Sequence, residues 1–286
     1  MAQLIEEDVA KRLLKGITIP PQPQIMVDLQ LEMTMSGVSI ERIAAIICKD
    51  AGISGSVLKV VNSPFFGLTK RITSIKQALS LLGINNIINI VNSVSISNSL
   101  SQTNFVEMTH FWDNAVDVAM AAATISRRTG LGSVDESYTL GLFHNCGIPM
   151  LMGKFPQYRQ ILLQAYRQEA QRITDLENEA ISCNHAVIGF YVARAWKLPN
   201  YLCEVIADHH KTEAIFAEQI NYDKTQKNLL AILKLAENIC KTHRTLGETA
   251  KDHEFERIKK HLLIYLGFSE YDFEDLRAAI SDIGLI

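Results

Sequence analysis

The sequence predicts an all-α protein, because almost every apolar segment repeats with helical period and almost none alternates as a strand does. Capping residues precede several of these segments, and glycine or proline follows them. The chain has 286 residues, of which 48% are hydrophobic and 21% charged, so it can bury one large core or two smaller ones. We therefore expect a helical globular protein.

The first hundred residues are expected to form short helices that end at glycine or proline. Helical spacing predicts them over residues 6–14, 25–36, 40–49, 53–62, 74–83 and 85–98. Ser39 can cap the third helix, and Pro64 ends the fourth. Ser74 and Gln77 form a capping-box pattern at the start of the fifth, which Gly83 closes.

A polar stretch over residues 99–105, SLSQTNF, lacks helical period and is the expected joint between two lobes. We place an N-terminal lobe at residues 1–103 and a C-terminal lobe at residues 104–286. In the second lobe, helices are expected near residues 109–128, 136–145, 156–169, 174–194, 199–210, 226–243, 252–265 and 271–282.

Composition argues against several classes of protein. The formal net charge of −3 gives no global attraction to nucleic acid or to an anionic membrane. No apolar run reaches the roughly 20 residues of a membrane span, and the start MAQLIEEDVAKRLL has acidic residues where a signal peptide has positive charge. Five cysteines without a C-x-x-C pair suit buried reduced thiols better than disulfides or structural zinc. We expect a cytoplasmic protein with no membrane partner.

Four histidines of the C-terminal lobe lie in or beside apolar helices: His144, His185, His209 and His210. One such histidine alone is more often a satisfied core or surface residue than a ligand. Four of them can converge, although the adjacent His209 and His210 would point about 100° apart on one helix. The set is therefore a candidate ligand-binding site.

Several motifs occur in an order that resembles one known family. They are Pro20-Pro21-x-Pro23, Asn62-Ser63 before Phe65-Phe66-Gly67, the segment 72–78, Leu82-Gly83, LFHNCG over residues 142–147, and Trp196-Lys197-Leu198-Pro199 before a double histidine. Over residues 17–212 the sequence is similar to the HDOD domain, a helical relative of the HD phosphohydrolase superfamily. The resemblance implies a two-lobed helical fold with an HD-like C-terminal lobe, and a commonly non-catalytic role in bacterial signalling.

Catalytic HD proteins carry a histidine, then a His-Asp pair, then a distant aspartate, and the resemblance implies where these positions fall. Asn114 stands at the first histidine, and His144-Asn145 stands at the His-Asp pair. Ile148 stands where some active relatives have a lysine. The intervening histidines are present, and a glutamate is nearest to the final aspartate: His185, His209, His210 and Glu237.

Two asparagines at ligand positions argue against a catalytic metal. Hydrolase metals are held by imidazole and carboxylate, whereas Asn114 and Asn145 supply only neutral amide oxygens. Ile148 also removes a phosphate contact. We expect no catalysis, no metal and no other cofactor. The alternative is a metal-dependent phosphohydrolase with an altered ligand set: His144, His185, His209, His210 and Glu237.

Nucleophilic catalysis and DNA binding have weaker support. Cys146 beside His144 would need a positioned base and electropositive surroundings to act as a nucleophile. Residues 49–62 resemble half of a helix-turn-helix motif with its turn at residues 51–54. The basic residues available for DNA phosphates are few: Lys49, Lys59, Lys70 and Arg71. DNA binding is therefore a minor alternative, and nucleic acid is not an expected partner.

We predict a non-catalytic HDOD protein that regulates through protein contacts or through a small anionic ligand held by the four histidines. Its partners would be signalling proteins recruited in trans, because no receiver, kinase or GGDEF-type module is attached. Phe65 and Phe66 are the expected contact residues, with core burial as the alternative. Exposure of either ring would favour contact.

Overall fold

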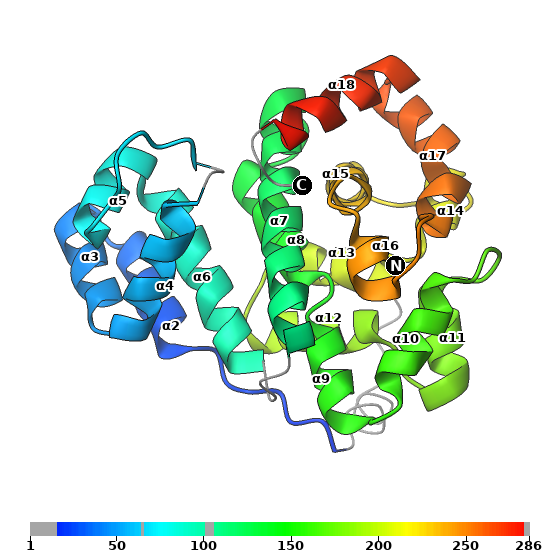
Figure 1. Ribbon diagram of the computed structural model, residues 1–286, viewed down its shortest axis with the longest axis horizontal. Helices are drawn as coiled ribbons and strands as arrows, with labels where there is room; N and C mark the ends of the chain where they lie inside the picture. Colours follow the sequence, from blue (N-terminus) through cyan, green and yellow to red (C-terminus); the bar gives the residue numbers. More distant parts are fainter. Residues whose placement is uncertain (1–15, 64–65, 101–105, 283–286) are drawn as a thin grey trace. The chain divides into compact units, whose positions relative to one another are not determined.

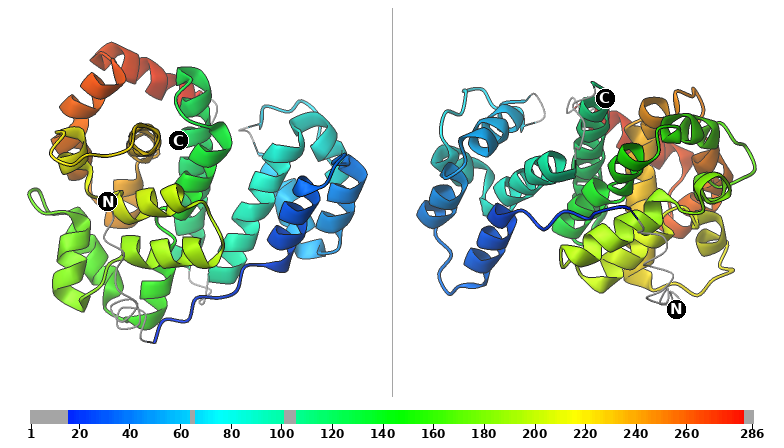
Figure 2. Two further views of the ribbon diagram at one scale, coloured as in Figure 1. Left: turned by 180° about the vertical axis from the view of Figure 1, so that it is seen from behind. Right: turned by 90° about the horizontal axis from the view of Figure 1, so that it is seen from below.

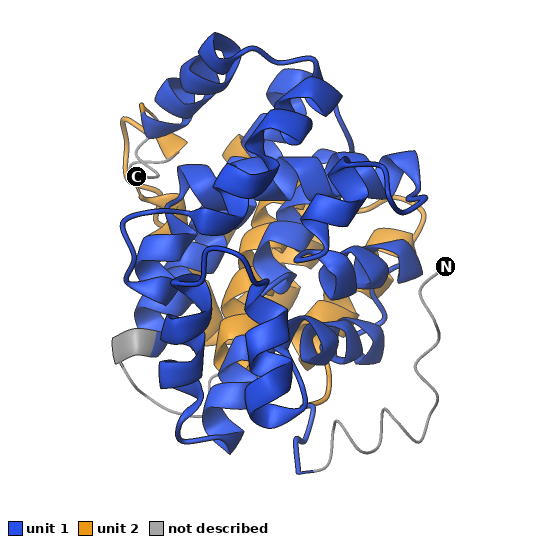
Figure 3. Ribbon diagram, turned by 90° about the vertical axis from the view of Figure 1, so that its right-hand side faces the viewer, with its two compact units in different colours: residues 1–19, 101–281, 286 blue, residues 20–100, 282–285 orange. Residues whose placement is uncertain are grey.

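The structure, a computed structural model, describes residues 16–63, 66–100 and 106–282 (Figure 1). These residues form helices and no strand, so the all-α prediction is confirmed. The chain divides into unit 1, residues 1–19, 101–281 and 286, and unit 2, residues 20–100 and 282–285 (Figure 3). Residues 101–105 of the expected joint and the expected helix at residues 6–14 lie outside the described residues. None of the described helices is long and apolar enough to cross a membrane.

Unit 2 is a bundle of short helices around an aliphatic core, seen from two further sides in Figure 2. Its described helices are α2 (Gln24–Thr34), α3 (Ile40–Cys48), α4 (Ala51–Val61), α5 (Ile75–Leu82) and α6 (Ile84–Leu100). Helix α6 contacts each of the other four. The core residues include Leu29, Ile47, Val57, Leu79 and Ile90. Apolar burial therefore accounts for how this unit holds together.

Side-chain caps start the helices of unit 2 where the sequence predicts them. The Ser39 hydroxyl accepts from the backbone N–H of Arg42 at 3.4 Å. The Ser74 hydroxyl accepts from the N–H of Gln77 at 3.2 Å and thus caps α5, while the Gln77 side chain accepts from the N–H of Thr73 rather than from that of Ser74. Asp50 caps α4 by accepting from the N–H of Ile53 at 2.9 Å. The expected turn at residues 51–54 is wrong, because Asp50 starts the helix before them.

Unit 1 is the larger bundle and contains the four histidines. Its described helices are α7 (Val106–Thr129), α8 (Val134–Phe143), α9 (Gly147–Lys154), α10 (Tyr158–Tyr166), α11 (Ile173–Ile181), α12 (His185–Ala195), α13 (Asn200–Asp208), α14 (Thr212–Phe216), α15 (Lys224–Ile239), α16 (Thr242–Gly247), α17 (His253–Leu266) and α18 (Glu270–Ser281). Helix α15 is buried along most of its length and contacts α7, α8, α13, α16 and α17, among which it is seen end-on in Figure 1.

Two long helices expected in unit 1 are each divided in the structure. Residues 174–194 form α11 and α12, because Ser182 takes a left-handed conformation with φ 56° and Asn184 caps the second helix. Residues 226–243 are divided between α15 and α16 at Lys241, which has φ 54°. Helices α9 and α14 were not expected at all. The first division matters most, because it makes His185 the first residue of a helix.

Two glycines allow the helices that carry the histidines to pack closely. A Cβ on Gly141 of α8 would lie 2.6 Å from the Cα of Ala119 on α7. A Cβ on Gly147 would lie 2.1 Å from the carbonyl oxygen of His185. Any larger residue at either position would therefore push the chain around His144 away from its neighbours.

The cysteines are free, and four of the five are buried. The exception is Cys48, which is exposed at the end of α3, so the expectation of burial is wrong for this residue. The thiol of Cys146 is buried, and burial raises its pKa well above the ordinary value. A thiolate is therefore disfavoured, which removes the support for nucleophilic catalysis at Cys146.

Candidate functional site

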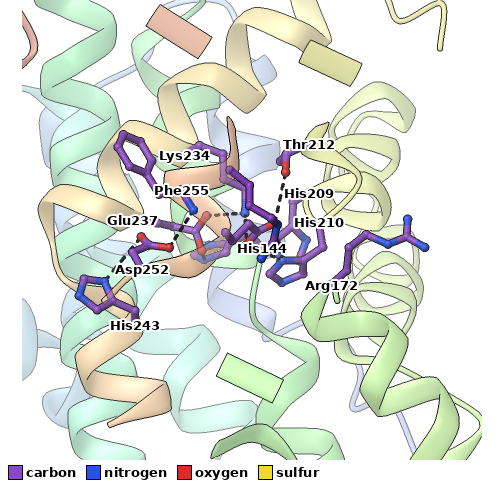
Figure 4. Close-up of polar contacts among 12 residues, drawn as sticks. His144, Arg172, His209, His210, Thr212, Lys234, Glu237, His243, Asp252 and Phe255 are labelled. Atoms are coloured by element: carbon purple, nitrogen blue, oxygen red, sulfur yellow. Dashed lines mark hydrogen bonds and ion pairs between the residues drawn. The ribbon is translucent and has the colours of Figure 1, made fainter. Parts of the chain in front are cut away.

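The four predicted histidines converge in the interior of unit 1 (Figure 4). His144 follows the last residue of α8, and His185 is the first residue of α12. His209 and His210 follow the last residue of α13. All four are at most 2% exposed. The chain thus brings three separate helix ends to one buried point.

Three of the histidines point one ring nitrogen at a common centre. The Nε2 atom of His185 lies 3.3 Å from Nε2 of His209 and 3.0 Å from Nε2 of His210. One ligand atom from each of the three lies within 4.8 Å of the others. His144 lies beside this trio, with its ring 5.4 Å from that of His209 and its Nε2 3.3 Å from Glu237 Oε1.

The other ring nitrogen of each histidine in the trio faces an oxygen acceptor. His185 Nδ1 lies 2.8 Å from Glu177 Oε2, and His210 Nδ1 lies 2.9 Å from Glu254 Oε2. His209 Nδ1 lies 2.7 Å from the carbonyl oxygen of Ile206. If each Nδ1 donates its proton to that oxygen, the three Nε2 atoms present lone pairs to one another. Such an arrangement repels itself unless a proton or a metal cation lies between the nitrogens.

Glu177 is a functional residue that the sequence reasoning missed. It is fully buried on α11 and accepts hydrogen bonds from the Tyr158 hydroxyl and from the backbone N–H of His185, in addition to its contact with the His185 ring. Expecting one helix over residues 174–194 hid this contact, because the chain turns back between Glu177 and His185. The signal that could have found it is Asn184, a good capping residue directly before an apolar run.

A buried group of charges lies against the histidines on the side of α15 and α17. Lys234 Nζ lies 2.9 Å from Glu237 Oε2 and 3.3 Å from Glu254 Oε2. Burial alone would raise the pKa of Glu237, but the Lys234 ammonium and His144 hold it well below its usual value. For Glu254 burial prevails, and its pKa is raised. Of these three residues, only Glu237 was predicted.

The neutral forms of His209 and His210 are favoured. Burial, and then the neighbouring ring of His210, holds the pKa of His209 well below its usual value. Burial and the Lys234 ammonium do the same for His210. Neutral imidazoles with free lone pairs suit a cation and give an anion no charge to bind.

Three residues were expected, from the resemblance, at positions where active relatives carry catalytic residues, and they lie elsewhere or supply little. Asn114 on α7 donates to the carbonyl oxygen of Cys240 at 3.2 Å, and no contact links it to the histidines within the described residues. Asn145 is buried, and its side-chain oxygen accepts no hydrogen bond. Ile148 is a fully buried core residue. None of them offers an anionic ligand.

Unit 2 contains the remaining predicted contact residues. Phe65 lies outside the described residues, and Phe66 is partly buried against the aliphatic core. The packing of Phe66 therefore supports the alternative of core burial. Three of the four basic residues considered for DNA line one groove of this unit: Lys59, Lys70 and Arg71.

The residues present fit one kind of metal site and not another. Imidazole nitrogens about 2.0–2.1 Å from a tetrahedral zinc lie about 3.3 Å apart, close to the two distances from His185 Nε2 to His209 and His210. Carboxylates on the outer nitrogens, here Glu177 and Glu254, are the usual support of metal-binding histidines. A paired hydrolytic metal centre does not fit, because such centres need a bridging anionic oxygen, and Glu237, the carboxylate beside His144, is paired with Lys234.

One protein family matches most of this chain. The HDOD domain family matches residues 19–212. An uncharacterized protein of Treponema pallidum (strain Nichols) is 29% identical over 195 residues, which cover 67% of this chain and 37% of that protein. The chain thus spans less than half the length of this relative.

Two solved structures share the fold. An HDOD domain protein of unknown function from Geobacter sulfurreducens has a TM-score of 0.70 at 22% identity, over 97% of each chain. A candidate phosphohydrolase from Shewanella amazonensis has a TM-score of 0.69 at 19% identity, over 96% of this chain and 94% of that one. At these identities the likeness concerns the fold alone.

Proposed function

The chain belongs to the HDOD family, and from this premise we propose that it is a signalling protein that acts by binding other proteins and does not hydrolyse phosphoesters. One observation carries the proposal: the four histidines are buried, and the carboxylates beside them are already engaged by other side chains. Glu177 and Glu254 contact the outer nitrogens of the histidines, and Glu237 pairs with Lys234. A phosphoester in the cleft that His210 lines would find no free bridging anion at the histidines.

A hydrolysis assay with restored ligands tests this proposal. Wild-type protein, purified without a chelator or a histidine tag, is offered Mn²⁺, Fe²⁺ or Mg²⁺ and assayed with bis(p-nitrophenyl) phosphate. We expect no turnover above the rate of the metal alone. The matched variants are Asn145→Asp and the double variant Asn114→His with Asn145→Asp, which supply the carboxylate and the imidazole that the chain lacks.

The outcomes of that assay are distinct. Turnover in the wild type that disappears in His185→Gln would contradict the proposal, because it would show that the centre hydrolyses with the residues it has. Turnover only in the double variant would support it, since the two asparagines would then be the reason for inactivity. Inactivity of all three proteins also agrees with it, because the burial of the histidines alone then prevents turnover.

The second candidate is metal binding at the trio, which the converging Nε2 atoms favour. His185, His209 and His210 would hold one divalent transition metal, and such a metal would supply a Lewis acid. This candidate keeps the metal-dependent phosphohydrolase as an alternative. Glu177, Ile206 and Glu254 would keep the three histidine rings in orientation, because each contacts the Nδ1 atom of one ring.

Elemental analysis separates the two candidates without any assay of activity. Stoichiometric metal in the wild type and little in His209→Gln would support the metal site. The control is His243→Gln, since His243 is a buried histidine outside the trio. Background metal in every protein would leave a proton, shared among the three rings, as the occupant of the centre.

A further inference from the structure

A second, separate polar site lies in unit 1, where α10, α15, α16 and the start of α17 meet. These elements line a cavity of about 20 Å³ that is partly open to solvent, and its lining residues include Tyr166, Glu237, Thr242, His243 and Asp252. One water-sized body needs about 10–15 Å³ of such volume. The cavity therefore has room for one small occupant and no shell of water around it.

The polar atoms of this cavity lack partners to an unusual degree. The hydroxyls of Tyr166 and Thr242 and the Nδ1 atom of His243 are buried and make no hydrogen bond. Glu237 Oε2 also lines the cavity, but it is paired with Lys234 Nζ at 2.9 Å. Buried polar atoms are almost always satisfied by protein, water or an ion. Their concentration around one cavity indicates a polar occupant.

The charge around the cavity favours a cation over a neutral occupant. Three carboxylates line it, those of Glu237, Asp252 and Glu254, against the single ammonium of Lys234. His243 Nδ1 approaches Asp252 Oδ2 only to 3.6 Å (Figure 4). Even with Glu254 protonated, as its raised pKa favours, one negative charge remains in excess. Asp252 accepts hydrogen bonds from Asn238 and from the backbone N–H of Phe255, but neither donor is charged, so an added positive charge would be stabilising.

The size of the cavity and the atoms that line it decide which cation can bind there. Magnesium keeps several of its waters when it binds, and the cavity has no room for them. Transition metals prefer nitrogen or sulfur, whereas oxygen atoms predominate here. We infer that this cavity is a binding site for one monovalent cation, Na⁺ or K⁺, held by the hydroxyls of Tyr166 and Thr242 and the carboxylate of Glu237.

The site would tie the C-terminal helices to the rest of unit 1. Thr242 and Asp252 lie beyond the residues that match the family, whereas Tyr166 lies within them. The two parts are in direct contact, because a Cβ on Gly247 of α16 would lie 2.3 Å from the Cβ of Tyr166. A cation shared between them would hold α16 against α10. It would also touch Glu237, whose other oxygen lies 3.3 Å from His144.

Thermal unfolding in different chloride salts tests the site. Wild-type protein is melted in KCl, in NaCl and in tetramethylammonium chloride at equal ionic strength, with EDTA present. We expect a midpoint at least about 2 °C higher in KCl or NaCl, with a saturable dependence on concentration, because a ligand that binds only the folded state stabilises it. Equal midpoints in all three salts would overturn the inference and assign the cavity to water.

Two variants locate the effect. Thr242→Val removes a hydroxyl from the cavity at nearly constant volume, and it should abolish the difference between the salts. Tyr222→Phe is the control, because the Tyr222 hydroxyl is also buried and unpaired but lines a different cleft. A salt effect that survives in Thr242→Val would refute the site, and so would one that disappears in Tyr222→Phe. If Thr242→Val does not fold, anomalous scattering from rubidium-soaked wild-type crystals decides.

Discussion

The two units of this protein bury different kinds of side chain. The core of unit 2 is aliphatic, and residues 20–100 contain no histidine. All eight histidines lie in residues 101–286, and four of them meet in the interior of unit 1 beside buried carboxylates and an ammonium. Unit 2 therefore depends on apolar burial, whereas unit 1 also depends on a network of buried polar groups.

The charges of the two regions differ as well. Residues 20–100 contain six Lys or Arg and four Asp or Glu, for a net charge of +2. The other residues contain 22 and 27, for a net charge of −5. Since unpaired buried charge is costly and easily disturbed, the polar network is where chemistry and regulation are to be expected. The functional site is therefore to be sought in unit 1 first.

The largest expected effect on the difference between the two units comes from removing the buried ammonium of Lys234 in unit 1. Lys234→Met leaves Glu237 and Glu254 without their shared partner. We expect a loss of about 3–5 kcal/mol in the free energy of unfolding, the usual cost of leaving buried charge uncompensated. Urea unfolding followed by tryptophan fluorescence measures it, because Trp112 and Trp196 both lie in unit 1.

The matched control in unit 2 is Lys76→Met. Lys76 also pairs with a glutamate, Glu41, at 2.9 Å, but both side chains are more than 60% exposed. Surface pairs contribute little, so we expect little or no change in stability. Equal effects of Lys76→Met and Lys234→Met would show that the two units do not differ in the way proposed.

Acidification should weaken unit 1 before unit 2. The folded protein holds His209 and His210 neutral, with pKa values well below the ordinary value, while the unfolded chain protonates them near pH 6.5. The unfolded state then binds more protons, so stability is full above pH 6.5 and is lost as the pH falls toward the folded pKa values. Glu254, whose pKa is raised, takes up a proton in the folded state and offsets part of the loss.

We expect a net loss of about 2–3 kcal/mol between pH 7 and pH 5.5 with EDTA present, from about 1.4 kcal/mol per pH unit for each histidine. Tryptophan fluorescence follows unit 1, and hydrogen exchange of α3 and α5 follows unit 2. If the hydrogen exchange of α3 and α5 accelerates at a higher pH than the fluorescence changes, unit 2 weakens first, and the expected order of the two units is wrong.

Asp117 gives a smaller effect with the opposite dependence on pH. Burial, and then the neighbouring Asp113, raises the pKa of this carboxyl on α7 to about 7. The folded state binds more protons between about pH 4 and 7, so stability falls as the pH rises through this range. Asp117→Asn should therefore stabilise the protein at pH 8 by on the order of 2 kcal/mol, after a discount for partial exposure.

The stabilisation by Asp117→Asn should disappear near pH 4, where the native carboxyl is protonated in both states. Asp113→Asn is the comparison variant, because it removes only the repulsion by Asp113, the smaller of the two causes that raise the pKa of Asp117. A larger gain from Asp113→Asn than from Asp117→Asn would mean that charge repulsion, and not burial, is the main cost.

The sequence predicts the helices well where a local signal starts them. Ser39 and Ser74 start their helices as expected, since each cap depends on a residue and its third neighbour along the chain. The four histidines could also be named, because helical spacing and the resemblance both single them out. Their convergence could not be derived from spacing, which is silent on how three helix ends meet.

The sequence does not predict which residues of distant helices contact the histidines. Glu254 reaches His210 across 44 residues, and Lys234 is one of many lysines that look solvent-exposed in a sequence. Helical period also continues through Ser182 without a visible break, because a left-handed residue other than glycine leaves no clear signal. The network around the histidines therefore depends on tertiary contacts that no local pattern records.

The break at Ser182 can itself be tested, with the smallest of the expected effects. Ser182 is exposed and has φ 56°, a conformation that is strained for every residue except glycine. Ser182→Gly should raise the free energy of unfolding by about 0.5–1 kcal/mol, because relief of strain exceeds the added freedom of the unfolded chain. Ser182→Val should lower it, since a β-branched residue fits this conformation least. Both changes are read from urea unfolding of unit 1. If glycine destabilises and valine does not, the two helices are separated by the cap at Asn184 alone, and the turn that brings His185 to Glu177 owes nothing to the backbone of Ser182.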